Sequence, residues 1–424
     1  MTCSVVVIAD DLTGAIDTVH GFAARDYVTA VVAVPPIDGR SNDIDSRVEI
    51  LGVNTDSRYA KTREAATAVH EAITLMSAEV VYKKVDSTLR GNLSAEIDAA
   101  LTASRADFAL VAPAFPSIGR TTVDGLHCVD GVPVAETEYG TDSKGPSSSV
   151  LSDLFSDLER RVETIPIDVV EAGRERVSEE FARYLERSDD APVFLCDARS
   201  SSDLATLALA GSRFETLYVG SGGLAEDVPV PESTGQPPSS PEVRTGVPLA
   251  VVGSANQRTL TQVAHVPRDH VIALDSRALL EGPASEDAAT RTIERLERER
   301  PVVLTTATNR EDVEITLKQG YELGLTQDEV GERVAAGLAA TAATVFENAS
   351  VSGLLYTGGE TAVAGLRALD TRTVRLTGES VETGIPVGYL GDGSGDGTPL
   401  VTKAGGFGSP EAINNCLETL LPRT

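Results

Sequence analysis

Carboxylate, basic and hydroxyl side chains gather at four points in the first third of the chain, each directly after a short apolar run. These clusters are Asp10 with Asp11, "NTDSR" at 54–58, "KKVDSTLRGN" at 83–92 and "PAFPSIGRTT" at 113–122. Arginine and lysine can fix an anionic ligand, hydroxyls can hydrogen-bond to it, and a carboxylate can accept a proton from it. The four clusters are therefore our candidates for a ligand-binding or catalytic site.

Each cluster taken alone has a second interpretation, because Asp, Asn and Ser after a strand commonly cap the helix that follows. We expect one member of the first acid pair, with Asp10 as the candidate, to do no more than this. Four clusters at four strand ends are harder to explain by capping. In a parallel sheet the ligand crevice lies outside the carboxyl ends of the strands, so such clusters would meet there.

The adjacent pair Lys83 and Lys84 is unusual in this chain, in which only six of the 36 basic residues are lysines. A compact positive charge that persists where lysine is otherwise rare indicates an anion to be bound. Side chains alternate along a strand, so only one of the two can point inward along a given face. A solvated or ion-paired lysine pair is the alternative.

Glycine-rich turns occur at three points of the second half of the chain, where a strand is expected to pass into a helix. The turns contain Ser254, which follows Gly253; Gly358, Gly359, Glu360 and Thr361; and Gly405 and Gly406, in a segment that runs to Ser409. Glycine lets a ligand approach backbone N–H groups, and a helix N-terminus favours an anion. Glycine at a single turn often serves turn geometry alone, but three such turns favour a phosphate cradle for a nucleotide.

The elements that must position these residues follow from the apolar pattern. Short β-branched runs alternate with amphipathic stretches, which is typical of βα units around a mostly parallel sheet. Residues 229–246 are rich in Pro, Ser, Gly and Thr without apolar periodicity and indicate a linker. We predict an α/β protein of two domains, each a mostly parallel sheet flanked by helices: residues 1–228, a linker at 229–247, and residues 248–424.

The composition excludes several classes of protein. The chain has 424 residues and a formal net charge of -28, so it lacks the basic face of a general nucleic-acid binder. Four separated cysteines and a start without a basic region or long apolar run are typical of a cytoplasmic protein with no membrane segment. The acidic, lysine-poor composition is typical of a halophilic surface. We expect small-molecule partners, and a homo-oligomer stays open.

Six motifs together resemble the four-carbon acid sugar kinase family. They are "ADDLTGAID" (9–17), "KKVDSTLRGN" (83–92), "PAFPSIGRTTVDGLH" (113–127), "GSGGLAE" (220–226), "TGGETA" (357–362) and "KAGGFGSPEAI" (403–413). The resemblance implies an N-terminal domain that binds a sugar acid and a C-terminal domain that binds ATP. It also implies phosphorylation of a hydroxyl, usually the 4-hydroxyl, of threonate, erythronate or 3-oxo-tetronate. Ala255 and Asn256 depart from the family pattern, in which Ser or Cys is common.

For such a substrate the candidate residues take definite roles. The base or substrate anchor is expected to be Asp11, with Asp86 second and Asp17 third. The substrate-binding residues are expected to be Asp10, Arg58, Lys83, Lys84, Ser87, Thr88, Arg90 and Arg120. The nucleotide is expected at Ser254, Gly358, Gly359, Glu360, Thr361, Gly405 and Gly406. Lys403 is another retained lysine, just before the last turn. Mg²⁺ is expected with ATP, but the sequence identifies no ligands for it.

Two other functions stay open. An NAD-dependent hydroxy-acid oxidoreductase needs a strand, G-x-G-x-x-G and a helix in one unit, and "GDGSGDG" (391–397) lacks the helix and is interpreted as an acidic turn. A non-catalytic sugar-acid sensor would have no need of three glycine-rich turns. A P-loop NTPase is excluded because no G-x-x-x-x-G-K-[ST] motif is present. Three interpretations of His127 stay open: a substrate contact, a polar residue at the interface of the lobes, or a loop histidine whose ring nitrogens have hydrogen-bond partners.

Overall fold

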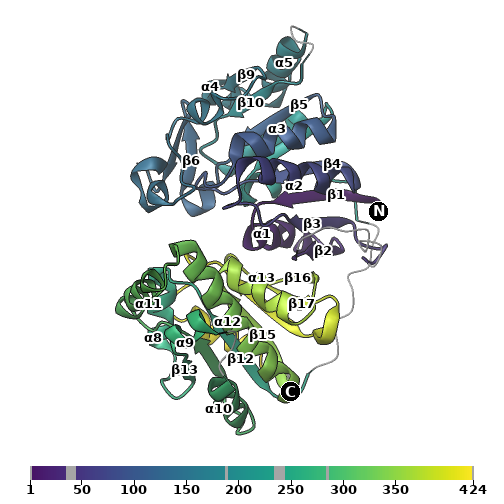
Figure 1. Cartoon of the computed structure of the whole chain (residues 1–424). Helices are drawn as coiled ribbons and strands as arrows, with labels where there is room; N and C mark the ends of the chain where they lie inside the picture. Colours follow the sequence, from purple (N-terminus) through teal and green to yellow (C-terminus); the bar gives the residue numbers. More distant parts are fainter. Residues whose placement is uncertain (1, 35–43, 187–189, 234–243, 283–285, 423–424) are drawn as a thin grey trace. The chain divides into compact units, whose positions relative to one another are not determined.

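The computed structural model describes residues 2–34, 44–186, 190–233, 244–282 and 286–422. The chain divides into two compact units, residues 1–236 and 237–424, which run from purple to teal and from green to yellow in Figure 1. Each unit is built on a mostly parallel sheet flanked by helices, so the predicted α/β fold class is confirmed. Most of the expected linker, residues 234–243, lies outside the described residues.

Parallel strands form the central sheet of the N-terminal unit in the order β2-β3-β1-β4-β11-β5-β10-β9. Their bounds are β1 Thr2–Ala9, β2 Thr29–Val32, β3 Ile50–Asn54, β4 Ser77–Lys84, β5 Phe108–Ala112, β9 Val162–Ile165, β10 Val193–Cys196 and β11 Thr216–Gly220. Ala9 lies opposite Asn54 and Lys84, and Lys84 lies opposite Gly220. Four adjacent strands therefore end at one edge, where the residues that follow them become neighbours.

Helices cover both faces of this sheet. They are α1 Leu12–Ala23, α2 Thr62–Thr74, α3 Leu93–Ser104, α4 Ile167–Glu171, α5 Arg174–Leu185, α6 Ser201–Gly211 and α7 Gly222–Ala225. Ile8 of β1 belongs to the core cluster that includes Ile73 of α2 and Leu101 of α3. Gly52 of β3 faces α1, because a Cβ there would lie 2.7 Å from the Val19 side chain. The alternation of side chains thus sends alternate strand residues to different helices.

A small antiparallel sheet, β6-β7-β8, follows β5 and was not predicted. Its strands are β6 Arg120–Val123, β7 Leu126–Val129 and β8 Val132–Pro133. Two Asp-Gly turns connect them, and all four turn residues have positive φ, from 50° at Asp130 to 80° at Gly131. Asp-Gly between short apolar runs is a strong hairpin pattern, so the sequence carried this information.

The sheet of the C-terminal unit has the order β13-β14-β12-β15-β18-β17-β16, in which β17 pairs antiparallel with both of its neighbours and the other pairs are parallel. The strands are β12 Val247–Val252, β13 Val271–Ala273, β14 Val302–Thr305, β15 Val351–Thr357, β16 Thr373–Glu382, β17 Ile385–Leu390 and β18 Pro399–Lys403. Thr357 lies opposite Val252 and Lys403. The three glycine-rich turns therefore start side by side.

The helices of this unit are α8 Gln257–His265, α9 Ser276–Glu281, α10 Glu286–Leu296, α11 Arg310–Glu322, α12 Gln327–Asn348, α13 Gly359–Ala368 and α14 Ala412–Thr419. The helical pattern from Glu311 to Asn348 predicts one long helical region, but this segment forms two helices, because Gly324 has a φ of 77° and Thr326 caps the start of α12 with a capping box. Across the described part of the chain, no helix has the length and apolar character needed to cross a bilayer.

Candidate active site

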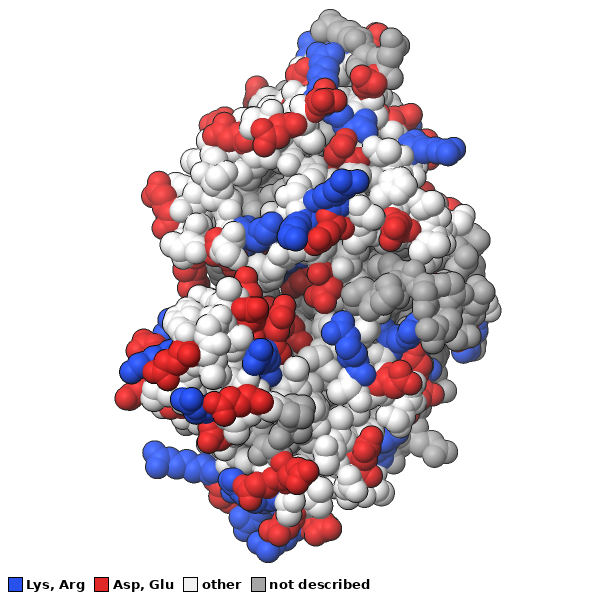
Figure 2. All heavy atoms as spheres, in the orientation of Figure 1, with Lys and Arg blue, Asp and Glu red and all other residues white. Residues whose placement is uncertain are grey.

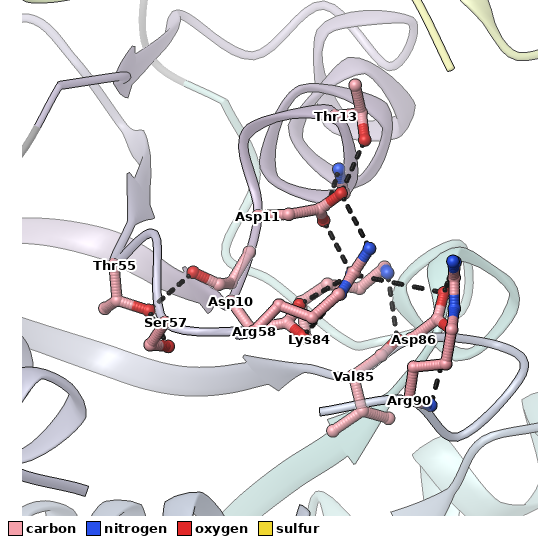
Figure 3. Close-up of polar contacts among 12 residues, drawn as sticks. Asp10, Asp11, Thr13, Thr55, Ser57, Arg58, Lys84, Val85, Asp86 and Arg90 are labelled. Atoms are coloured by element: carbon pink, nitrogen blue, oxygen red, sulfur yellow. Dashed lines mark hydrogen bonds and ion pairs between the residues drawn. The ribbon is translucent and has the colours of Figure 1, made fainter. Parts of the chain in front are cut away.

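The guanidinium of Arg58, which belongs to the second cluster, lies between the acids of the first cluster and Asp86 of the third (Figure 3). Its Nε and Nη2 donate to the two carboxylate oxygens of Asp10, both at 2.8 Å, and its Nη1 donates to Asp11 at 2.9 Å. Asp86 lies 4.0 Å from Nη2. The Arg58 side chain is only 10% exposed, so the charges meet largely away from water. Arg58 therefore organises the carboxylates and has few donors left for a ligand.

Asp11, and not Asp10, caps helix α1. Its carboxylate accepts hydrogen bonds from the backbone N–H of Gly14 at 3.0 Å and from the hydroxyl of Thr13 at 2.6 Å. The expectation that Asp10 is the capping residue, and that the capping acid has no other role, is therefore wrong, because Asp11 also contacts Arg58. Burial alone would raise the pKa of Asp11, but Arg58 and Lys84 lower it. Asp11 is thus held as a carboxylate.

Asp86 lies in the loop after β4 and is enclosed by donors. Arg90 donates through Nε at 2.7 Å, and the hydroxyl of Thr88 donates to the same carboxylate. Burial opposes ionisation, but Arg90 and Arg58 together hold the pKa of Asp86 well below its usual range. The Arg90 guanidinium also lies 5.3 Å from the ring of Tyr139 and 3.7 Å from a carboxylate oxygen of Asp142. The segment around Tyr139 and Asp142 thus contacts the outer side of this loop.

The two adjacent lysines point to different faces of the sheet, as alternation along a strand requires. Lys84 faces α1: its ammonium donates to the carbonyl of Val85 at 2.9 Å and lies 3.1 Å from where a Cβ of Gly14 would be. Lys83 is fully buried on the other face and pairs with Glu96 of α3 at 2.9 Å. Lys84 therefore lies beside the carboxylates at the strand ends. Lys83 instead forms an internal ion pair and does not fit the expected substrate-binding role.

The two lysines give a matched pair of variants. Lys83→Met is expected to lower the free energy of unfolding by about 3–5 kcal/mol, because Glu96 is left buried and unpaired, and Lys83→Met with Glu96→Leu should recover most of it. Lys84→Met should instead lower kcat/KM by roughly 100-fold, the effect expected when a cation that holds an anionic substrate is lost. Urea unfolding and steady-state kinetics measure the two effects. Equal activity losses in both single variants would contradict this assignment.

Asp17, the third acid of the first motif, lies near Lys84 on the next turn of α1. Burial is the main cause that raises its pKa, the nearby Asp11 adds to the rise, and Lys84 opposes it. A Cβ at Gly222 would lie 3.2 Å from a carboxylate oxygen of Asp17. The motif "GSGGLAE" therefore reaches the same strand edge, and its glycine makes room beside this carboxylate.

His127 has partners for both ring nitrogens, as the third alternative expects, but it lies on strand β7 and not in a loop. Its Nε2 lies 2.9 Å from the carbonyl oxygen of Ser87, so this nitrogen must carry the proton, and its Nδ1 then accepts from the hydroxyl of Thr122 at 2.9 Å. It ties β7 to the loop that carries Asp86. Arg120, on the neighbouring strand β6, donates to the carbonyl of Ile118. Ser87, one of the expected substrate-binding residues, contributes its carbonyl oxygen to the contact with His127.

A pH-dependent stability is expected from His127. Burial lowers its pKa below 6.5, so in acid the unfolded state binds the additional proton, and stability contributed by the neutral ring is lost as the pH falls below about 6.5. His127→Gln keeps a donor for Ser87 but does not titrate. The stability advantage of the wild type over His127→Gln should shrink between pH 7 and pH 5 in urea unfolding. His70→Gln, at an exposed position of α2, is the control, and a constant advantage would argue against the prediction.

The glycine-rich turns of the C-terminal unit approach one another closely. A Cβ at Gly405 would be well inside contact distance of the Ser254 hydroxyl, and one at Gly253 would overlap the Thr361 hydroxyl. Gly358 has a φ of 90°, a conformation that favours glycine. The first backbone bond of α13 runs from Ala362 to Gly358, so the N–H groups before Ala362 at this helix start have no acceptor within the helix. This arrangement can hold phosphate oxygens.

Asn256, where the sequence departs from the family pattern, caps α8 by accepting from the N–H of Arg258 at 2.9 Å. Its own N–H donates to the hydroxyl of Ser254 at 3.3 Å. The departure therefore has a local structural role. Among the residues that the structure describes, no group of three or more His, Cys, Asp or Glu side chains is placed to hold a metal ion.

Sequence reasoning missed several residues that shape the first site. The Asn92 amide donates to the carbonyls of Ser57 and Ala60 at 3.0 and 3.1 Å, and its oxygen accepts from Lys144 at 3.0 Å. Asn92 ends the motif "KKVDSTLRGN", so its position could have suggested a role. Asp142 and Lys144 come from an irregular segment without periodicity, and no pattern in the sequence pointed to them.

Comparisons with known proteins cover both units. The family model described as a sugar-binding N-terminal domain matches residues 5–228, and the one described as a nucleotide-binding C-terminal domain matches residues 249–413. The chain is 31% identical to a D-threonate kinase of Salmonella typhimurium, over 97% of each chain. It is 30% identical to a D-erythronate kinase of Heliobacterium modesticaldum, over 99% of this chain and 98% of that one.

A 3-oxo-tetronate kinase of Cupriavidus necator is 28% identical over 97% of this chain and 96% of the relative. In fold, the chain is similar to the crystal structure of a Haemophilus influenzae protein, with a TM-score of 0.75 and 21% identity over 98% of this chain and 100% of the other. The matched domains, the relatives of nearly equal length and the six motifs agree. The chain therefore belongs to the four-carbon acid sugar kinase family.

Proposed function

We propose that the protein transfers the γ-phosphate of ATP to a hydroxyl, most simply the 4-hydroxyl, of a four-carbon sugar acid such as threonate, erythronate or 3-oxo-tetronate. The observation that carries the proposal is the convergence of Asp10, Asp11, Arg58, Lys84 and Asp86 at one strand edge. Fixed cations and ionised carboxylates side by side suit a ligand that is both an anion and a polyol. The relatives named above support the class of reaction.

The roles of the side chains follow from their contacts. Lys84 is the cation that binds the acid group of the substrate, because Arg58 and Arg90 are already engaged with Asp10, Asp11 and Asp86. Asp11 receives the proton of the attacking hydroxyl. Asp17 is the rival base, since a raised pKa makes a stronger proton acceptor. The pH dependence of kcat/KM in Asp11→Asn and Asp17→Asn decides between them. In an enzyme that keeps its base, kcat/KM falls at low pH as the base is protonated, and only the variant that lacks the base should lose this fall.

The nucleotide is placed at the turns after β12, β15 and β18. Ser254, Gly358, Gly359, Glu360, Thr361, Gly405 and Gly406 are the residues proposed to contact it. The proposal rests on the close approach of the three turns: a Cβ at Gly253 would overlap the Thr361 hydroxyl, and one at Gly405 would overlap the Ser254 hydroxyl. ATP supplies the phosphoryl group, and the Mg²⁺ expected with it would neutralise phosphate charge. These turns offer backbone N–H groups to the phosphates.

The test is ATP consumption by the purified protein with Mg²⁺ in molar KCl. The acceptor panel consists of D- and L-threonate, D- and L-erythronate and the 3-oxo-tetronates. Turnover with one member identifies the substrate, and NMR of the product shows which hydroxyl carries the phosphate. ATP binding without turnover of any member would contradict the proposed acceptor and favour a sugar-acid sensor instead.

A further inference from the structure

Lys403 is the last residue of β18, and its ammonium points into the turn formed by the residues that follow it. The residue is fully buried, and its Nζ lies 3.0 Å from the carbonyl oxygen of Ala404, 3.3 Å from that of Phe407 and 3.5 Å from that of Gly405. The hydroxyl oxygen of Thr259, on α8, is a fourth partner at 3.2 Å. An ammonium has three protons, so these acceptors use all of them. Lys403 therefore has no donor left for a ligand.

The direction of these carbonyls fixes the direction of the amides that follow them. In a trans peptide the C=O and N–H groups point in opposite directions. Because the carbonyls of Ala404, Gly405 and Phe407 point at Nζ, the N–H groups of Gly405, Gly406 and Gly408 point away from it. None of these three N–H groups donates to an acceptor within the part of the chain that the structure describes. Gly405 and Gly406 carry two successive outward N–H groups, as in an anion-binding nest, and Gly408 adds a third beyond Phe407, whose own N–H donates to the carbonyl of Ala404.

Other side chains hold the same turn from outside. The amide of Gln262 donates to the carbonyls of Phe407 and Ser409 at 2.9 and 2.8 Å. Glu382 accepts from the N–H of Ser409 at 2.6 Å and from its hydroxyl at 2.8 Å. The hydroxyl of Thr259 donates to the carbonyl of Gly405 at 2.9 Å. The turn is thus rigid before any ligand arrives, which reduces the entropic cost of binding.

We propose that Lys403 is a positioning residue for the nucleotide. Its buried ammonium gathers the carbonyls of the turn, so that the N–H groups of Gly405, Gly406 and Gly408 form a site for one phosphate of ATP or ADP. Lysines of nucleotide sites usually reach the phosphate as a point charge, whereas this one acts through the backbone. The inference rests on the proposed function for the identity of the anion, but the contacts of Lys403 do not depend on it.

The test uses the full chain and the variant Lys403→Met, which keeps the length of the side chain and removes its protons. The Kd for ADP, measured by calorimetry, should rise by roughly 10- to 100-fold, the effect of losing one or two charge-assisted hydrogen bonds. In the absence of nucleotide, the amides of Phe407 and Ser409 should exchange hydrogen faster than in the wild type. Lys318→Met, at an exposed position of α11, is the matched control and should change neither quantity.

Thr259→Val is a milder second variant, in case Lys403→Met does not fold. It removes one partner of the ammonium and one donor to Gly405, so both quantities should shift in the same direction by a smaller factor. Weaker ADP binding with unchanged amide exchange would overturn the proposal, because it would indicate direct contact with the nucleotide. A wild type that does not bind ADP would count against the proposed function, while amide exchange would still decide whether Lys403 holds the turn.

Discussion

Arg58→Met is expected to lower the free energy of unfolding by about 3–5 kcal/mol, because it leaves buried carboxylates without their shared cation. Arg58 contacts Asp10 through two parallel hydrogen bonds and Asp11 through a third. Without it, Asp11 and Asp86 lose a charge that lowers their pKa values. One of the clustered acids should then take up a proton near neutral pH, and urea unfolding curves between pH 5 and pH 8 measure the loss.

The same variant should nearly abolish activity at pH 7, with kcat/KM lower by about 1,000-fold or more, because the base and the acceptor site lose their geometry together. Arg58→Lys restores the charge but not the fork of donors, so it should recover only a small part of both losses. Arg63→Met, on the exposed side of α2, is the matched control. A variant Arg58→Met with wild-type stability would show that Arg58 does not hold the cluster.

Gly253→Ala is expected to remove nucleotide binding almost completely while leaving the N-terminal unit intact. The new Cβ would overlap the hydroxyl of Thr361. This residue belongs to α13, which follows the neighbouring strand β15, so the turn after β12 must move away from α13. A shift of about 1 Å in a positioned group can cost roughly 100-fold in rate. We expect the Kd for ADP to rise by about 100-fold or more, as measured by calorimetry.

Two further variants make this result interpretable. Gly405→Ala should act in the same way, because its Cβ would meet the Ser254 hydroxyl from the third turn. Gly21→Ala, in α1, places a methyl group where nothing lies within 4 Å, and it should leave ADP binding unchanged. If Gly253→Ala binds ADP as tightly as the wild type, the three turns are not the nucleotide site.

The sequence alone predicted the elements well where the apolar pattern was long and regular. The apolar run at residues 79–84 predicts a strand and lies within β4, and the amphipathic stretch at 93–104 predicts a helix and forms α3. The break between α11 and α12 was not predicted, because helical periodicity continues on both sides and only Gly324 and Thr326 interrupt it. The hairpin sheet β6-β7-β8 was also missed, because its strands are too short to show a clear alternation, although its Asp-Gly turns are a hairpin signal.

For the candidate site, residue types and their place at strand ends identified the cluster but not the contacts within it. Alternation along β4 predicts that Lys83 and Lys84 face opposite ways, yet which of them meets Asp11 depends on the register with β1. That Arg58 is saturated by carboxylates, and so organises them, depends on side-chain geometry across three strands. The role of Asp142 depends on an irregular segment whose path no local pattern sets.

The position of β18 within its sheet affects the order in which the C-terminal unit can form during synthesis. This strand, residues 399–403, pairs with β17, which directly precedes it in the chain, and with β15, which ends much earlier, at Thr357. A growing chain therefore has β12 and β15 long before the strand that completes the sheet and brings in the third turn. Until then, the nascent C-terminal unit is held by the apolar contacts of its earlier elements, and stabilisation by a ligand at the proposed three-turn site comes only after β18 is made.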